Sequence, residues 1–138
     1  MTDAPSADVP ARLAFATGRL NRRLRSAGGG ISHGLLSALA TVRAHGPLRL
    51  ADLAQLETVS APSITRLVAE LEAKGLVSRQ TDPDDGRAIL ISVTDQGVAM
   101  IASARAARAA MIAELFEPLT EDEIASITAA LPALEKML

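Results

Sequence analysis

Small and hydrogen-bonding side chains gather in one short stretch in the middle of the sequence. Its members are Ser60, Ala61, Pro62, Ser63, Thr65 and Arg66. Ser60 can cap a helix, and Pro62 suits a first turn because its missing N–H costs nothing there. Small side chains let a helix backbone approach base edges, where hydroxyl and guanidinium groups can form hydrogen bonds. The stretch predicts the start of a helix that contacts the major groove of DNA.

A second set of candidate DNA contacts follows that helix. Residues 81–87 have turn chemistry throughout, and they join two β-prone runs at 76–80 and 88–93, a pattern that predicts a β-hairpin. Arg87 at the hairpin tip, beside the predicted groove-contacting helix, is placed to enter the minor groove. Arg79, in the first run, is included among the candidate DNA-binding residues.

Residues suited to catalysis are scarce. Cysteine is absent and only His33 and His45 could act as acid–base groups; the motifs GxSxG, HExxH and GxGxxG do not occur. Gly28–Gly30 lacks the strand and the lysine of a phosphate-binding loop. We therefore expect that the protein is not an enzyme and that it has neither a cofactor nor a metal site. A metal-sensing regulator using both histidines and Glu114 remains an alternative, although histidines twelve residues apart do not share a helical face.

Helices must position these groups. Apolar periodicity and capping residues predict helices over 11–26, 32–45, 50–56, 60–74, 94–117 and 120–138, with Thr120 and Glu123 forming a capping box. Pro132 is expected to kink or break the last helix. Two short helices followed at once by a hairpin form a winged helix-turn-helix. The predicted fold class is mainly α with a small β-hairpin wing and with N- and C-terminal dimerisation helices.

The outer helices carry apolar stripes that one small lobe cannot bury. The stripes comprise Leu13, Leu20 and Leu24 in the first helix and Ile124, Ile127, Leu131 and Leu134 in the last. They predict an obligate homodimer. The predicted domains are a flexible arm at 1–10, a dimerisation helix at 11–31, a DNA-binding lobe at 32–94 and dimerisation helices at 95–138.

Charge is unevenly distributed along the chain, although the net charge is only −2. Seven arginines and no carboxylate lie between Asp8 and Asp52, whereas six carboxylates and one lysine lie between Glu114 and Leu138. The segment from Leu50 to Arg87 holds seven carboxylates, which predicts modest, salt-sensitive DNA affinity. No apolar run could span a membrane, so we expect a cytoplasmic protein with no membrane partner.

The central region resembles the MarR family of transcriptional regulators. The segments 63–68 and 71–77 are similar to the family's recognition helix and its exit into the wing. Residues 82–87, followed by Leu90, Val93 and Thr94, are similar to its wing signature, a D-x-R motif ending in an L-T pair, with Val93 replacing the leucine.

That resemblance implies a homodimer on double-stranded DNA, binding an inverted-repeat operator, with repression as the expected outcome. It implies that Arg87 reaches the minor groove or an adjacent phosphate, and that Asp85 helps to hold this arginine. Family members respond to amphipathic anions or phenolic compounds. Because aromatic residues make up 1% of this chain, a lipophilic effector is expected instead. A helical protein-interaction module that does not bind DNA remains the alternative from another class.

Overall fold

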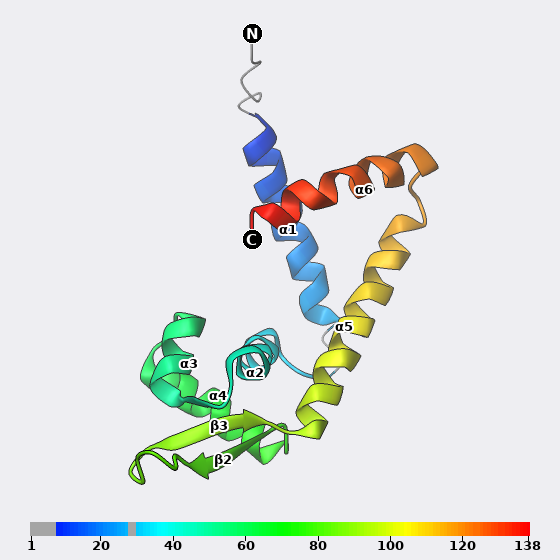
Figure 1. Cartoon of the computed structure of the whole chain (residues 1–138). Coiled ribbons are helices and arrows are strands. Elements are labelled where there is room, and N and C mark those ends of the chain that lie inside the picture. Colours follow the sequence, from blue (N-terminus) through cyan, green and yellow to red (C-terminus); the bar gives the residue numbers. More distant parts are fainter. Residues whose placement is uncertain (1–7, 28–29) are drawn as a thin grey trace.

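Capping residues and apolar periodicity set the secondary structure. The computed structural model describes residues 8–27 and 30–138 of the chain (Figure 1). Its elements in chain order are α1 (Asp8–Ser26), α2 (His33–His45), β1 (Leu48–Arg49), α3 (Leu50–Glu57), α4 (Ala61–Ala73), β2 (Val77–Thr81), β3 (Ile89–Val93), α5 (Asp95–Phe116) and α6 (Glu121–Lys136). The predicted fold class, mainly helical with a small β wing, is confirmed.

Side-chain caps begin four of the helices at the predicted places. Ser32, Ser60 and Thr94 each accept a hydrogen bond from the backbone N–H three residues later. Thr120 and Glu123 form the predicted capping box at α6. These caps satisfy N–H groups that have no partner within the helix.

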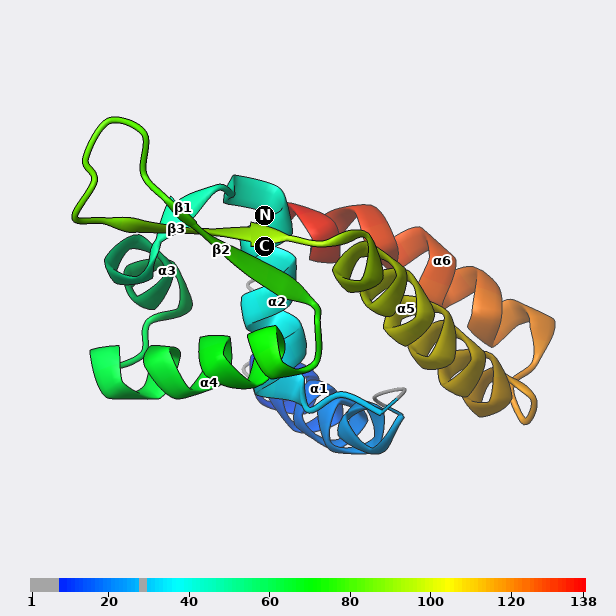
Figure 2. The same cartoon turned by 90° about the horizontal axis from the view of Figure 1, so that it is seen from below.

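Residues 31–104 form one lobe around an aliphatic core. The largest fully buried side chains are Leu39, Leu53, Ile64, Leu71, Ile91, Ile101, Val42 and Val68. They come from α2, α3, α4, β3 and the first half of α5. Ile31, which the sequence placed with the first helix, is also buried in this core. Figure 2 shows the sheet on one side of α2 and α4.

The sheet of the lobe has three antiparallel strands in the order β1-β3-β2. β2 and β3 form the predicted hairpin, with Val77 paired to Val93 and Thr81 paired to Ile89. The sequence did not predict β1, which adds Leu48 and Arg49 to the other edge of β3. The wing is therefore attached to the segment that precedes the helix-turn-helix.

α5 leaves the lobe through a close contact at Gly97. A β-carbon at this position would clash with the Leu76 carbonyl oxygen and the Val93 side chain. Thr94 fixes the same junction, because its hydroxyl donates to the Gly75 carbonyl at 2.6 Å and accepts from the Gly97 N–H at 3.1 Å. The direction of α5 is thus set by the wing and by the end of α4.

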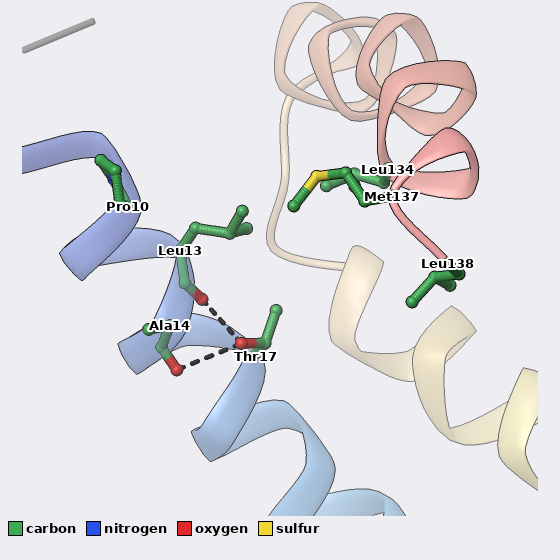
Figure 3. A pocket seen from close by; sticks show the side chains of 7 residues that line it. All are labelled: Pro10, Leu13, Ala14, Thr17, Leu134, Met137 and Leu138. Carbon is green, nitrogen blue, oxygen red and sulfur yellow. Dashed lines mark hydrogen bonds between the residues drawn. The ribbon is translucent and has the colours of Figure 1, made fainter.

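The two arm helices, α1 and α6, extend away from the lobe and contain no buried residue. Phe15 on α1 is 66% exposed and Leu131 on α6 is 44% exposed. Between these helices lies an apolar hollow of about 450 Å³, lined by Pro10, Leu13, Ala14, Thr17, Leu134, Met137 and Leu138 (Figure 3).

The structure differs from the sequence predictions at both ends of the chain. Pro132 does not break α6, which continues to Lys136, because a proline this near a helix end removes one backbone hydrogen bond and leaves the earlier turns intact. α1 begins at Asp8, so residues 8–10 of the expected flexible arm are helical. The rest of that arm, residues 1–7, lies outside the described residues.

Candidate nucleic-acid interface

α4 separates an apolar face from a polar one. Ile64, Val68 and Leu71 are buried against the lobe. The opposite face exposes Ala61, Pro62, Thr65 and Arg66, with Ser63 half-buried beside them. No carboxylate lies within salt-bridge distance of Arg66 among the described residues. Its guanidinium can therefore bind an external acceptor.

The hydroxyl groups at the start of α4 are partly committed to the helix itself. Ser60 Oγ accepts from the Ser63 N–H at 3.3 Å and lies 2.9 Å from Ser63 Oγ. Thr65 donates to the Ala61 carbonyl at 2.8 Å. Each hydroxyl oxygen retains capacity for a further hydrogen bond, so these groups can hold the helix start and also contact a base or a phosphate.

The turn before α4 is held by a carboxylate. Glu57, at the end of α3, accepts hydrogen bonds from the hydroxyls of Ser37 and Thr41 on α2. Thr58 then adopts a left-handed conformation with φ of 54° and caps α3, although glycine would adopt it more easily. In the sequence, Glu57 is one of the seven carboxylates expected to weaken DNA binding. The structure shows that this half-buried side chain fixes α3 and its turn on α2.

An ion pair joins the root of the wing to β1. Arg49 donates to Asp82 at 2.8 Å and lies 3.9 Å from a carboxylate oxygen of Asp85. Asp82 is only 7% exposed and also accepts from the Asp84 N–H at 2.9 Å. The hydrogen bond from Arg49, followed by that from Asp84, holds the pKa of Asp82 below its ordinary value. The sequence does not predict this pair, because its members lie 33 positions apart.

The wing tip exposes Arg87. Asp85 accepts the backbone N–H of Arg87 at 3.1 Å, and among the described residues the Arg87 guanidinium has no carboxylate within 4 Å. Asp85 thus orders the backbone of the tip, and its other carboxylate oxygen lies 3.9 Å from an Arg49 terminal nitrogen.

Arg79 stands apart from the other candidate residues. It lies on β2 and forms an ion pair with Glu72 of α4. Its charge is therefore partly neutralised, and the pair links the end of α4 to the wing.

Neither histidine belongs to a group of potential metal ligands within the described residues. His33 faces Arg108, with 3.4 Å between the His33 Nδ1 and an Arg108 terminal nitrogen. In the part of the chain that the structure describes, no three His, Cys, Asp or Glu residues could hold a metal ion. No described helix is both long enough and apolar enough to cross a membrane.

Known proteins share this arrangement. The model of the MarR family matches residues 31–89. An HTH-type transcriptional regulator of Mycobacterium bovis is 38% identical over 122 residues, which span 84% of this chain and 85% of the relative. The chain belongs to the MarR family.

Two further proteins are similar to this chain, one in sequence and one in fold. The HTH-type transcriptional repressor MdtR of Bacillus subtilis is 33% identical over 105 residues, covering 74% of this chain and 68% of the repressor. A variant of MepR from Staphylococcus aureus, solved bound to an oligodeoxyribonucleotide, matches with a TM-score of 0.71 at 20% identity, over 93% of this chain and 96% of MepR. The family and these relatives are transcriptional regulators, not enzymes, and the chain is a DNA-binding transcriptional regulator.

Proposed function

We propose that this MarR-family chain binds an inverted-repeat operator as a homodimer and represses transcription. The observation that carries the proposal is the polar start of α4, which has no carboxylate in its first turn, on the same lobe as an exposed wing arginine. A similar chain is named a repressor, and a MepR variant of the same fold was solved with an oligodeoxyribonucleotide. Both facts support DNA binding and repression by this chain.

The candidate residues then divide by role. The start of α4 enters the major groove, where Arg66 and the hydroxyls of Ser60, Ser63 and Thr65 contact base edges and Ala61 and Pro62 permit close approach. Arg87 enters the minor groove or binds a phosphate, and Asp85 orders the tip. Arg79, paired with Glu72, contributes by holding the wing against α4.

The dimer follows from the arm helices. α1 and α6 leave apolar side chains exposed on either side of the 450 Å³ hollow. A second copy would bury these surfaces, and a two-fold dimer would set two α4 helices on successive major grooves when they are about 34 Å apart. An inverted-repeat operator matches that symmetry.

Two substitutions test the DNA contacts. Arg66→Ala should weaken operator binding and reduce discrimination between operator and unrelated DNA, because a base contact is lost. Arg87→Ala should weaken binding to most sequences and lower the slope of log affinity against log salt by about 0.9 for one lost phosphate contact. Lys136→Ala, which removes a positive charge from α6, is the matched control and should bind like the parent. Fluorescence anisotropy at several salt concentrations provides the measurement, and parent-like binding by both arginine variants would refute the interface.

We further propose that a small effector changes the spacing of the α4 helices. A hollow of about 240 Å³ lies between α2 and α5, lined by His33, Leu36, Ser37, Ala40, Ile101, Arg105 and Arg108. Within the described residues, Arg108 Nε is buried without a hydrogen-bond partner. This basic lining suits a small compound with an acidic group better than the purely lipophilic ligand expected from composition.

Distance measurements test that mechanism. The chain has no native cysteine, so Ala73→Cys, at the end of α4, accepts a single spin label. A panel of small carboxylates should shift the label-to-label distance in the dimer, whereas uncharged alcohols of the same size should not. The shift should disappear in Arg108→Ala. Release of DNA without any change in distance would refute the spacing mechanism.

A further inference from the structure

The helix α3 begins differently from its neighbours. α2, α4, α5 and α6 each begin after a serine or threonine whose side chain accepts a backbone N–H of the first turn. The residue at this position of α3 is Arg49, and its side chain forms no capping hydrogen bond. A guanidinium group has no acceptor atom, and its positive charge is unfavourable beside the N-terminus of a helix. Capping therefore does not account for an arginine at this place.

The side chain of Arg49 extends to the wing instead. One terminal nitrogen donates to an Asp82 carboxylate oxygen at 2.8 Å, and the same nitrogen lies 3.9 Å from an Asp85 carboxylate oxygen. The hydrogen bond to Asp82 first, and the charge of Asp85 to a smaller extent, hold the pKa of Arg49 above its ordinary value. A single guanidinium therefore serves two wing carboxylates.

Asp85 lies between this guanidinium and the arginine at the wing tip. One of its carboxylate oxygens accepts the backbone N–H of Arg87 at 3.1 Å, and the other faces Arg49. The carboxylate is thus within reach of the long side chain of Arg87. In the described parts of the chain, however, Arg49 is the one cationic side chain within 4 Å of Asp85, and Arg87 has no carboxylate within that distance.

We propose that Arg49 is a positioning residue for DNA binding, which engages the carboxylate of Asp85 and so keeps the guanidinium of Arg87 free for DNA. The proposal rests on the wing contact of Arg87 proposed above and adds the residue that maintains it. Asp85 orders the backbone of the tip, but its charge would otherwise pair with the arginine that must bind DNA. Arg49 removes this conflict from the neighbouring strand β1.

Substitution of Arg49 tests this role. Arg49→Thr places a residue that can cap α3, so weaker DNA binding would not reflect a weaker helix start. Affinity should fall about three- to fivefold, the most that one exposed ion pair supplies. Arg87→Ala should then cost at least about threefold less affinity in Arg49→Thr than in the parent. Fluorescence anisotropy at low salt, with a labelled DNA duplex of arbitrary sequence, measures each affinity, because phosphate contacts do not depend on sequence.

A second substitution removes the competing charge. Asp85→Asn keeps a side-chain oxygen for the Arg87 N–H, and it should raise affinity at least about threefold more in Arg49→Thr than in the parent. Arg49→Gln, which keeps an N–H donor for Asp82, repeats the comparison if Arg49→Thr does not fold, as judged by circular dichroism. Lys136→Ala removes the same charge from α6 and is the matched control, which should bind like the parent.

The outcomes separate this proposal from the one it rests on. If Arg87→Ala bound DNA like the parent, the wing contact and the positioning role would both be refuted. If Arg87→Ala weakened binding but Arg49→Thr did not, the positioning role alone would be refuted. Additive losses from Arg49→Thr and Arg87→Ala, with no larger gain from Asp85→Asn in Arg49→Thr, would also overturn it, because Arg49 would then contact a phosphate directly.

Discussion

The lobe and the arm helices contain similar apolar residues, but only the lobe buries them. Both are rich in Leu, Ile and Ala, yet the lobe buries Leu39, Leu53 and Leu71 completely while α1 and α6 bury no residue. An apolar helix face needs a second surface to cover it. The lobe provides that surface from its own chain, and the arms do not. Stability of the lobe should therefore be independent of protein concentration, and stability of the arms should depend on it.

The largest expected effect comes from a core leucine. Leu39→Ala, at a position with 0% exposure, should lower the free energy of unfolding by about 3 kcal/mol, because burial is lost and a cavity remains. Leu131→Ala on α6 is the matched change at a residue 44% exposed. It should leave lobe unfolding almost unchanged and raise the dimer dissociation constant. Urea denaturation at two protein concentrations measures both, and equal effects in a monomeric sample would contradict the distinction.

Substitutions at two glycines, one in the lobe and one on α1, test the same difference in packing. Gly97→Ala should destabilise the lobe by about 1–3 kcal/mol, because the new methyl group would clash with the Leu76 carbonyl oxygen. Gly18→Ala on α1 meets no described atom within 4 Å and should stabilise that helix by about 0.5–1 kcal/mol. Thermal unfolding measures the two shifts. If Gly18→Ala instead weakened dimerisation, the partner would have to pack closely at Gly18.

Loss of Glu57 should have an intermediate effect. Glu57→Ala removes the acceptor for Ser37 and Thr41 and should cost about 1 kcal/mol of unfolding free energy. Glu70→Ala removes an exposed carboxylate that lies 3.9 Å from Lys74 and should change stability by less than about 0.5 kcal/mol. Operator affinity should fall for Glu57→Ala, since the turn before α4 loses its anchor. If Glu57→Ala lost no more unfolding free energy than Glu70→Ala, the hydrogen bonds from Ser37 and Thr41 to Glu57 would not stabilise the fold.

The smallest expected effect concerns pH. The hydrogen bond from Arg49 lowers the pKa of Asp82 below its ordinary value of 3.8. A lowered pKa in the folded state means that the carboxylate stabilises the fold above this ordinary value and that the benefit is lost as pH falls through the folded pKa. Asp82→Asn should therefore be less stable than the parent at pH 7, with the difference shrinking below pH 3.8.

Asp84→Asn, at an exposed neighbour in the same turn, is the control for Asp82→Asn. Its unfolding free energy at pH 7 should lie within about 0.5 kcal/mol of the parent's. A difference between parent and Asp82→Asn that stayed constant down to pH 2.5 would show that the Arg49 pair does not cause the pH dependence.

Local signals made most of the lobe predictable. Ser60 and Pro62 marked the start of α4, Thr94 marked α5, and the turn at 81–87 marked the hairpin, because each feature depends on residues close in sequence. β1 was missed because two residues show no periodicity. The Arg49–Asp82 and Glu57–Ser37 contacts were missed because each joins segments that only the fold brings together.

Pro132 was expected to kink or break the last helix. The helix is not broken, because α6 runs through Pro132 to Lys136. The capping box at Thr120 and the regular spacing of Ile124 and Ile127 stabilise the preceding turns, so one missing hydrogen bond does not end the helix. The roles assigned to Arg66, Arg79, Asp85 and Arg87 stay predictions, because sequence and fold place these side chains without showing the DNA.

Control by this chain would depend on how much of it a cell holds. α1 and α6 bury no residue in a single copy, so a functional form built on them appears through mass action. Below the dissociation constant, the amount of dimer rises with the square of the chain concentration. Halving synthesis would then reduce the dimer to about one quarter, and a regulated gene would respond more steeply than in proportion to the abundance of the chain.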